Sequence, residues 1–338
     1  MSADEYSVQM HEVLLSLAGR VPDEFVALAR QELADGAITQ VAEAVCQELA
    51  RQAVTLGIRQ ADLLSRLVDH SAAETFGRIR IRDEQSVLAW RFTGEAPSPT
   101  VEPRPSVEAR PFEHSAAVDA LIAVLSDTTG ARGLWRAWRI PIRGQGPPLP
   151  VYVVEADTAD PAGLTGRLQR ALTTVDSDVP RVEVVAPGAE VPMYQRAARS
   201  YGPLVWTATE PAQVRLARAF DGVDDAGEPF FTEDHPRLLD AAERERVLDY
   251  LRAATVVLHT DATMEDVVDP ARGAVVPTAF RSDGSWIWPD IVSYFLDEHG
   301  LAPDERLLAH VRNADGPPAP LDAVTTHHVL EHLFNAQD

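Results

Sequence analysis

Along the first 70 residues, apolar side chains recur every three or four positions, which is the spacing of amphipathic helices. Four such segments are separated by residues typical of helix boundaries, namely Gly19, Pro22, Gly36 and Gly57. Residues 76–92 then alternate apolar and polar side chains, a pattern that predicts a short β-hairpin. We therefore expect a helical N-terminal domain over residues 1–93, closed by this hairpin.

A segment rich in proline follows the predicted helical domain. Residues 94–111 contain five prolines and show no hydrophobic periodicity. Such a composition favours an extended, polyproline-type spacer over packed secondary structure. The segment predicts the first domain boundary, with the next domain beginning at residue 112.

The next segment, residues 112–222, alternates between strand-like and helix-like patterns. Strands are predicted at residues 134–142, 151–156, 181–186 and 203–207, with helices after Pro161, Pro192 and Pro211. This alternation favours a small mixed sheet of the βαβ type with helical crossovers. The segments after Pro192 and Pro211 share the order Pro-x-x-x-Arg-x-Ala-Arg-x-aromatic. We interpret them either as a duplicated unit or as two helices that each begin with proline.

The remainder, residues 223–338, predicts a third module of the α+β type. A helical pattern over residues 238–258 precedes a hairpin around Ser282-Asp283-Gly284, because Asp-Gly strongly favours a tight turn. Further helices are predicted after Pro289, after Pro303 and at the chain end. The whole chain is thus expected to be an α+β protein: a helical N-terminal domain, a mixed-sheet middle domain and an acidic C-terminal module.

Composition excludes several classes of chemistry. All 30 basic residues are arginine, so every mechanism that needs a lysine ammonium is excluded, including Walker-A phosphate binding and Schiff-base catalysis. The net charge of −22 argues against nucleic acid or an anionic membrane as a partner. Residues 211–338 alone hold 24 acidic residues and ten arginines, a concentration of negative charge that favours a basic protein partner.

The single cysteine and the first residues indicate the cellular compartment of the protein. Cys46 cannot form an internal disulfide, and it lies beside the apolar face of a predicted helix, so it is expected to be a core residue. The first residues are acidic rather than basic, and no apolar run reaches the roughly 18 residues that span a bilayer. We therefore expect a cytoplasmic protein.

Carboxylates gather after one predicted strand. Glu155, Asp157 and Asp160 leave the carboxyl end of strand 151–156, where ligands of α/β proteins tend to bind. Hard oxygen ligands of this kind suit Mg²⁺ or Mn²⁺, which gives the hypothesis of a metal-dependent hydrolase or transferase. The alternative is a solvated acidic loop and helix cap. The Asp-rich stretch 221–227 lacks the alternating positions of a calcium loop and is expected to be a turn.

A basic, aromatic cluster occupies the only net-positive region, residues 96–150. Its arginines, which alternate with Trp135 and Trp138, are Arg132, Arg136, Arg139 and Arg143. Arginine and tryptophan together suit an anionic ligand, through ion pairing and stacking. The alternative is that these arginines pair with the surplus carboxylates of the protein.

The predicted last helix carries the pattern His328-x-x-Glu331-His332, which is that of inverzincin zinc sites. Only six residues follow His332, so a third ligand would have to come from elsewhere in the fold. The alternative is a terminal helix with its histidines on the solvent side. We predict no cofactor.

The predicted C-terminal hairpin carries a recognisable pattern, Arg281-x-Asp283-Gly284-x-Trp286-x-Trp288, within residues 276–312. This segment resembles a C-terminal module of proteins from high-GC bacteria. The resemblance covers about a tenth of the chain and implies a bacterial, cytosolic protein. No activity is established for that family, so no functional residue is transferred from it.

The same hairpin supplies the predicted interface. Trp286 and Trp288 project to one face at period two, and Asp283 and Asp290 flank them. Exposed, these residues would suit a hot spot for an arginine-bearing partner; packed inward, the indoles would serve the core. We therefore expect a non-catalytic, cytosolic protein-binding protein, either an immunity-type inhibitor or an adaptor. The alternatives are the metal-dependent enzyme above and a structural component of an oligomer.

Overall fold

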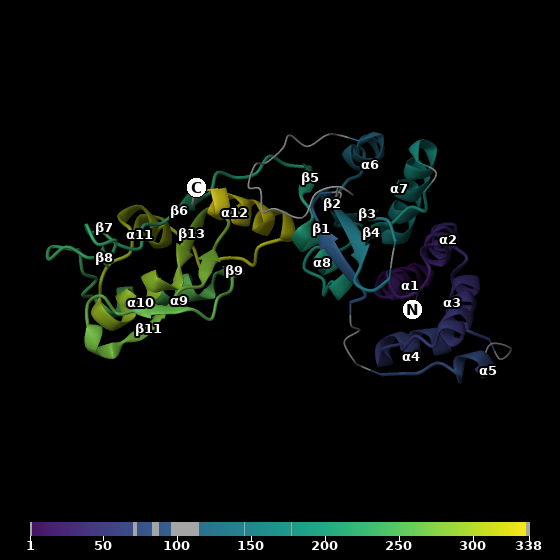
Figure 1. Cartoon of the computed structure of the whole chain (residues 1–338), viewed down its shortest axis with the longest axis horizontal. Coiled ribbons are helices and arrows are strands. Elements are labelled where there is room, and N and C mark those ends of the chain that lie inside the picture. The colour runs from purple at the N-terminus through teal and green to yellow at the C-terminus, as the bar shows by residue number, and fades with distance from the viewer. Residues whose placement is uncertain are drawn as a thin grey trace. The chain divides into compact units, whose positions relative to one another are not determined.

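The computed structural model describes residues 2–69, 73–82, 88–95, 115–144, 146–176 and 178–335. The fold belongs to the α+β class, as predicted, with helices and mixed sheets. The chain divides into two compact units, Met1–Thr209 and Glu210–Asp338, whereas the sequence predicted three modules with a boundary after residue 222. The predicted spacer lies outside the described residues from residue 96 onward. Figure 1 labels the elements of both units.

The first unit begins with helices, as the sequence predicted. They are α1 (Ala3–Leu17), α2 (Asp23–Ala34), α3 (Ile38–Gln52), α4 (Ile58–Leu67) and the short α5 (Ala73–Phe76). A capping box of Ser2 and Glu5 starts α1. Gly19 and Gly36 follow α1 and α2 with positive φ, as expected of residues that end helices. Gly57 instead precedes α4, and Ala53 takes the left-handed conformation after α3.

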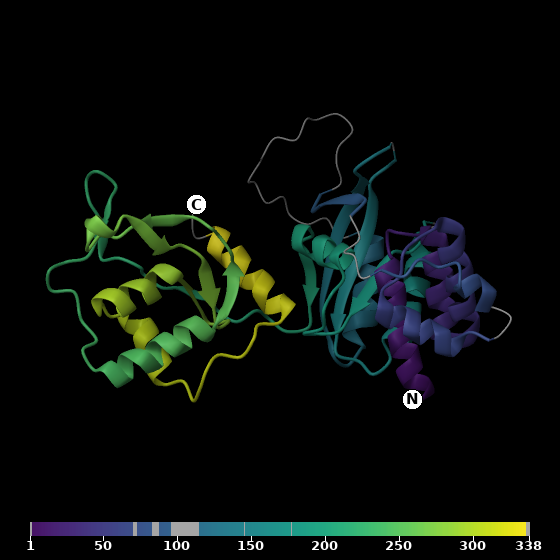
Figure 2. The ribbon, with the colours of Figure 1, turned by 90° about the horizontal axis from the view of Figure 1, so that it is seen from below.

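A five-stranded sheet forms the rest of this unit. Its strands are β1 (Trp90–Thr93), β2 (Ala131–Pro141), β3 (Leu149–Ala156), β4 (Val182–Val185) and β5 (Leu204–Thr207). The order is β1-β2-β3-β4, and β5 shares the β1 edge of the long strand β2. Strands β3 and β4 are parallel and joined by α7 (Pro161–Val175), which confirms the predicted βαβ crossover. Figure 2 shows α1–α4, in purple, gathered to one side of these strands.

The two faces of this sheet bury different side chains. One face carries Tyr152 and Val154 of β3 against α7 and α6 (Ala116–Ser126), in an apolar core. The alternate residues of β3 and β4, including Glu155 and Glu183, lie on the opposite face, which α8 (Met193–Tyr201) covers in part.

Two sequence predictions are wrong here because pairing partners lie far away in sequence. The described residues of the segment 76–92 pair with remote parts of the chain instead of with each other: Phe92 of β1 pairs with Arg139 of β2, and Ile81 bridges to Leu56. The predicted helix after Pro211 is instead β6 (Arg215–Leu216), which pairs with a strand more than 70 residues later. The pattern from Pro211 to Phe220 is too short to fix a helix by itself when the edge of a strand is free to pair.

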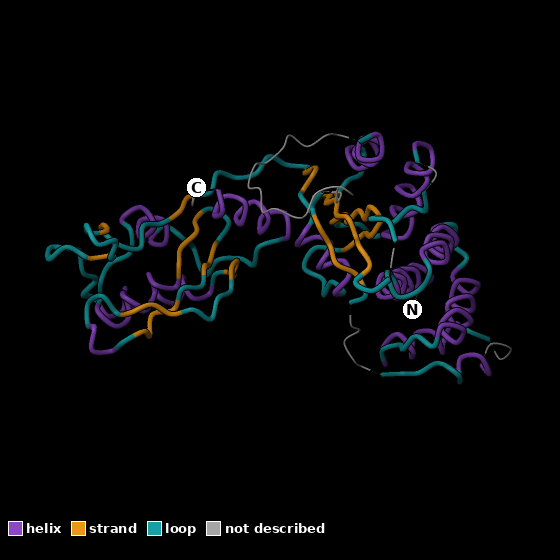
Figure 3. The backbone as a smooth tube through the Cα atoms, viewed as in Figure 1, coloured by secondary structure: helices purple, strands orange, loops and turns teal. Residues whose placement is uncertain are grey.

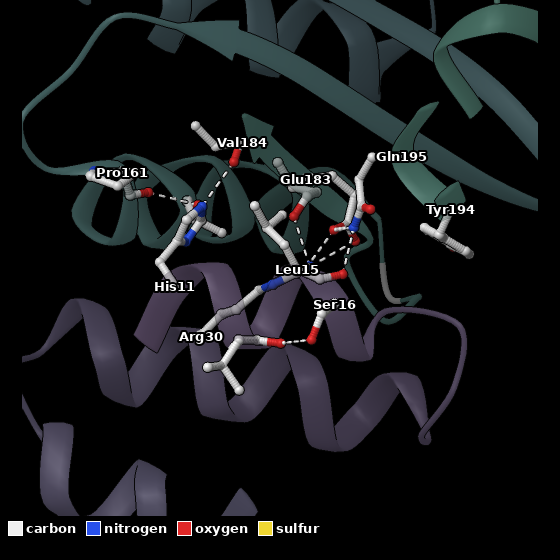
Figure 4. A network of polar contacts seen from close by, with 12 residues as sticks. His11, Leu15, Ser16, Arg30, Pro161, Glu183, Val184, Tyr194 and Gln195 are labelled. Atoms are coloured by element: carbon white, nitrogen blue, oxygen red, sulfur yellow. Dashed lines mark hydrogen bonds and ion pairs between the residues drawn. The ribbon is translucent and has the colours of Figure 1, made fainter. Parts of the chain in front are cut away.

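The helical region and the sheet form one unit because buried polar contacts join them. Nε2 of His11 lies 2.8 Å from the backbone oxygen of Val184, and the Arg30 guanidinium forms two bonds to the carboxylate of Glu183, at 2.8 and 2.5 Å. Gln195 donates to Glu183 and to the backbone oxygen of Leu15. Figure 4 shows this network between α1, α2 and β4. These links explain why residues before and after the spacer pack together.

The second unit is built on a four-stranded sheet. Its order is β6, β13 (Trp286–Pro289), β12 (Phe280–Ser282) and β9 (Thr255–Leu258). Helices α9 (Ala241–Ala253), α10 (Asp290–His299) and α11 (Glu305–Arg312) cover one face, and α12 (Ala323–Asn335) covers the other. The predicted β12–β13 hairpin is confirmed, while the helix predicted over 238–258 gives way to β9 after Ala253. Figure 3 shows these strands in orange.

Two small ribbons complete the second unit. β7 (Gly222–Val223) pairs with β8 (Pro229–Phe230), and β10 (Thr263–Glu265) pairs with β11 (Ala274–Pro277); a 3₁₀ turn, η1, spans Pro270–Arg272. Across both units, the described helices include none with the length and apolar character needed to cross a membrane.

Candidate functional site

The predicted interface on the β12–β13 hairpin does not lie on the surface. Trp286 is 5% exposed and Trp288 is fully buried, and both pack with α9, α10 and α11 in the core. Ile287, between them, packs against α12 on the other face. The period-two prediction is therefore confirmed, but the face that carries the indoles is the inner one, so the core interpretation replaces the interface.

The two predicted interface aspartates are occupied inside the unit. The Asp283 carboxylate accepts from the Tyr250 hydroxyl at 2.9 Å and lies 2.6 Å from Nε2 of His310, and it also binds the backbone of its own turn. Burial, followed by the contact with Asp283, raises the pKa of Tyr250 well above its usual range. Asp290 forms an ion pair with Arg281 at 2.6 Å. Both carboxylates hold the hairpin in place.

The predicted carboxylates after β3 do not converge. Glu155 is buried and forms an ion pair with Arg199 at 3.1 Å, whereas the Asp157 side chain is 74% exposed. Asp160 caps α7 by accepting from the backbone of Gly163. Within the described part of the chain, no three His, Cys, Asp or Glu side chains are placed to share a metal ion. The helix-cap and loop interpretation therefore fits this segment better than a metal site.

The side chains of the predicted zinc pattern on α12 do not form a metal site either. His328 lies 3.7 Å from Glu331, on the same helix, and packs half-buried. Among the residues with described positions, no third His, Cys, Asp or Glu side chain is placed to share a metal ion with them. Val329 and Leu333 of the same helix are fully buried against the sheet, so α12 serves as a packing helix.

The arginines of β2 do not form one patch. Arg139 is buried, bonds to Asp23 and to the Tyr194 hydroxyl, and stacks 4.0 Å from the centre of the Trp90 ring. Arg132 forms an ion pair with Asp157 at 3.6 Å, and Arg136 lies on the opposite face of the strand from Arg139. Arg143 is exposed beyond the strand end. The interpretation in which these arginines pair with carboxylates holds for Arg132 and Arg139.

A pocket that the sequence did not indicate lies in the second unit. Its volume is about 400 Å³. Three phenylalanines from separate segments meet in its wall: Phe231 lies 4.9 Å from Phe295 and 5.2 Å from Phe220, centre to centre. Leu301, Ala302 and Leu308 add further apolar surface. The pocket therefore has one apolar, aromatic wall, which suits an apolar side chain, and charged residues line the rest of it.

The loop that contains Asp221 and His235 forms one wall of this pocket and is held there by hydrogen bonds. The Asp221 carboxylate accepts from the backbone and the hydroxyl of Thr232, each at 2.8 Å, and contacts Nδ1 of His235. Nε2 of His235 lies 3.0 Å from the backbone oxygen of Ala302, on the opposite wall. Burial alone would raise the pKa of Asp221, but the bonds from Thr232 and His235 outweigh it and lower the pKa.

An acidic hairpin extends from the same loop. We use this name for residues 221–234, which comprise β7, β8, the turn between them and the residues that follow. The predicted turn over residues 221–227 is confirmed: Oδ1 of Asp224 accepts from the backbones of Ala226 and Glu228, and Gly227 has φ of 88°. Val223 is 64% exposed beside these carboxylates.

Around the pocket, the arginines have partners, but several carboxylates do not. Its three arginines have partners: Arg218 contacts Asp304, Arg312 contacts Glu243, and Arg237 donates to the backbone of His299. The exposed carboxylates of the acidic hairpin, by contrast, form no ion pair with any residue that the structure describes; they are Asp225, Glu228, Glu233 and Asp234. The acidic hairpin, which shares Asp221 and Phe231 with the pocket wall, thus carries unpaired negative charge.

The only sequence signals for this site were general ones. The excess of acidic residues after residue 210 was visible, and so was the Asp-rich turn. Phe220, Phe231 and Phe295 lie up to 75 positions apart, and nothing in their local sequence indicates that their rings meet. In comparisons with protein-family models, with curated proteins and with solved structures, nothing matches this chain.

Proposed function

We propose that the protein is a non-catalytic, cytosolic binding protein that docks a segment of another protein on its Glu210–Asp338 unit. The docked segment presents one large apolar side chain, flanked by lysine or arginine. The observation that supports this proposal is the pocket with its wall of three phenylalanines, from which the acidic hairpin extends. The site proposed from the sequence on Trp286 and Trp288 is replaced, because those indoles are buried.

The pocket receives the side chain that anchors the partner. A volume of about 400 Å³ accommodates a large aliphatic or aromatic side chain together with neighbouring atoms of its backbone. Interfaces between proteins gain most of their binding energy from a few such anchors that are fully desolvated on binding. The ring edges of Phe220 and Phe231 favour an aromatic anchor, since offset and edge-to-face pairs add to the burial of area.

The acidic hairpin supplies selectivity for a basic partner. Its unpaired carboxylates attract lysine or arginine, speed the encounter and oppose acidic competitors. They pay no large desolvation penalty while they stay at the rim. This arrangement agrees with the net charge of residues 211–338, in which acidic residues outnumber arginines by 24 to ten.

Two features support a binding role over catalysis, one at this pocket and one in the Met1–Thr209 unit. Both ring nitrogens of His235 already contact acceptors, Asp221 and the backbone of Ala302, so the imidazole is not directed at a substrate. The buried thiol of Cys46 has its pKa raised to about 11 by burial, which makes it a poor nucleophile and agrees with a reducing cytosol.

The test is a selection of peptides from a random display library on the full-length protein. The proposal expects enriched peptides with one Phe, Trp, Leu or Met next to Lys or Arg, and binding that weakens as salt rises. The pocket-filling variant Ala302→Leu should weaken the selected peptide about tenfold or more. The double variant Asp225→Arg/Glu228→Arg should weaken it by about fivefold to 20-fold.

A matched control separates the hairpin from general surface charge. Glu245 and Asp249 lie exposed on α9, and neither lines the pocket. Their double reversal to arginine changes the net charge equally and should change affinity less than about twofold. The proposal fails if no apolar–basic consensus is enriched, if Ala302→Leu binds as well as the natural protein, or if both charge reversals have the same effect.

A further inference from the structure

A second cavity, in the Met1–Thr209 unit, carries arginines in an otherwise acidic protein. Its volume is about 400 Å³, and it lies where the α1–α2 and α3–α4 connections meet the residues before β1 and the start of α8. Among the residues that the structure describes, three arginines line it, Arg20, Arg82 and Arg196, against one carboxylate, Glu190; Arg82 has a partner of its own, so we base the inference on Arg20 and Arg196. We propose that this cavity binds a small organic phosphate ester of about the size of a mononucleotide.

Arg20 is the first reason for an anionic ligand. Its guanidinium donates to the backbone oxygens of Ser16 and Thr55, at 3.2 and 2.5 Å, and lies 3.3 Å from the Thr55 hydroxyl. No carboxylate among the described residues contacts it, and burial lowers its pKa. The buried arginines of this unit elsewhere have carboxylate partners, as Arg30 has in Glu183. Arg20 thus brings uncompensated positive charge into the cavity wall.

The opposite wall is also suited to an anion. Arg196 is exposed on α8, and the part of the chain with described positions offers it no carboxylate partner. Pro192, before the first turn of α8, makes no side-chain cap, so the backbone N–H groups at this helix end add to the positive potential. Among the described lining residues, Glu190 is the carboxylate that opposes an anion here, and the C-terminal end of α1 opposes it more weakly, so removing the Glu190 charge should tighten anion binding.

The shape and lining favour an organic ester over a bare ion. Arginine forks bind phosphate in a bidentate manner, but a phosphate group fills only a fraction of the cavity. The remaining wall is apolar and aromatic: it includes Trp90, whose indole nitrogen donates to the backbone of Gly19, and Tyr194. Cavities of this size and mixed lining hold drug-sized or nucleotide-sized molecules.

The experiment measures binding of four probes to the full-length protein by isothermal titration calorimetry, at low and at moderate salt. The probes are AMP, ribose 5-phosphate, adenosine and inorganic phosphate. We expect AMP or ribose 5-phosphate to bind at least about tenfold more tightly than inorganic phosphate, and adenosine to bind at least about tenfold more weakly than AMP. Affinity for the esters should fall as salt rises.

Three variants assign the binding to this cavity. Arg196→Gln should weaken ester binding about fivefold to tenfold, because it removes one charge from the wall. Glu190→Gln should tighten it about twofold to fivefold, because it removes the opposing charge. Arg167→Gln, an exposed arginine on α7 outside the cavity, should change affinity less than twofold.

Each other outcome overturns the proposal. It is overturned if neither ester binds at 5 mM, if inorganic phosphate binds as tightly as the esters, or if adenosine binds as tightly as AMP. It is equally overturned if Glu190→Gln weakens the ester, or if Arg167→Gln has the effect expected of Arg196→Gln. None of these results bears on the peptide-binding pocket of the other unit, so the two proposals fail independently.

Discussion

The two units hold their inner carboxylates in different ways. In Met1–Thr209, arginines hold them: Glu183 pairs with Arg30, Glu155 with Arg199, and Asp23 with both Arg139 and Arg181. In Glu210–Asp338, Asp221, Asp266 and Asp283 are held mainly by histidine, tyrosine, threonine and backbone groups, although Arg272 also lies 3.7 Å from Asp266 and Arg281 pairs with Asp290. Asp266 accepts from the Tyr294 hydroxyl at 3.0 Å and from two backbone N–H groups, and it lies 2.7 Å from Nε2 of His299.

This difference separates a long-range from a local mode of assembly. The contacts of the first unit join residues far apart in sequence, up to 180 positions for Leu15 and Gln195. Those of Asp221, Asp266 and Asp283 with their histidines span 14 to 33 positions. Arginine stays charged at all accessible pH, whereas carboxylates and histidines titrate, so the units should also respond differently to acid.

The largest expected effect follows from breaking a buried pair in the first unit. Glu183→Gln leaves the Arg30 charge, which is 2% exposed, without its carboxylate. We expect a loss of about 3–5 kcal/mol in the free energy of unfolding of that unit. Hydrogen exchange resolved by peptide measures each unit separately. Glu74→Gln, which breaks an exposed pair with Arg78, should cost less than about 1 kcal/mol.

The double variant Arg30→Met/Glu183→Leu sharpens this test. Replacing both partners with apolar residues removes the uncompensated charge, so much of the lost stability should return. If the double variant is as unstable as Glu183→Gln, the cost lies in packing rather than in the isolated charge.

A close approach in the first unit predicts the next effect. Gly19 has φ of 71°, and a Cβ atom there would lie 2.5 Å from the Tyr194 ring. Gly19→Ala should therefore cost roughly 2–4 kcal/mol, from the backbone strain and the clash together. Gly36→Ala isolates the strain, because its φ is 86° and nothing lies within 4 Å. In urea unfolding, Gly36→Ala should lose about 1 kcal/mol in the free energy of unfolding. An equal loss in Gly19→Ala would contradict the predicted clash with Tyr194.

Asp266 predicts acid sensitivity in the second unit. Burial opposes ionisation, but the bonds from His299, the backbone and Tyr294 prevail and lower its pKa to about 2. A carboxylate with a depressed pKa stabilises the fold above its ordinary pKa, near 4, and this contribution is lost as the pH falls toward 2. Asp266→Asn should cost about 2 kcal/mol at pH 7 and flatten the pH profile below 4. The exposed Asp261→Asn should leave the profile unchanged.

His11 predicts a smaller effect, in the first unit and at milder pH. Burial lowers its pKa to about 4, so the folded unit keeps a neutral imidazole while the unfolded chain binds a proton below about pH 6.5. Stability should therefore fall between pH 6.5 and 4, by about 1 kcal/mol at pH 5.5. His11→Gln, which can still donate to Val184, should lose this pH dependence. A slope that persists in His11→Gln would assign it to another group.

Much of the fold was predictable because local patterns fixed it. The α1–α4 helices, the β3–α7–β4 crossover, the β12–β13 hairpin and the helix after Pro289 were each indicated by periodicity and turn residues. The predictions failed where the partner was remote. β1 pairs with β2 rather than in a local hairpin, and β6 replaces a helix because β13 offers it an edge.

The candidate sites were less predictable than the fold. The sequence marked conspicuous residues, such as Trp286 and Trp288, but these proved to be core. The pocket with the three phenylalanines and the arginine-lined cavity are made by residues that are individually ordinary. Phe231 or Arg20 becomes informative only when its neighbours, and the absence of a carboxylate partner among the described residues, are known.

The sequence by itself determined the α+β class, most of the elements, the exclusion of lysine chemistry and the acidic character of the last third of the chain. These properties depend on composition and on side-chain spacing within about 20 residues. Only the tertiary structure decided which face of each strand is buried, which arginines are paired, and that the helical region and the first sheet are one unit. The reason is physical: burial and charge pairing depend on what lies across the interface, and that neighbour is set by contacts between distant residues.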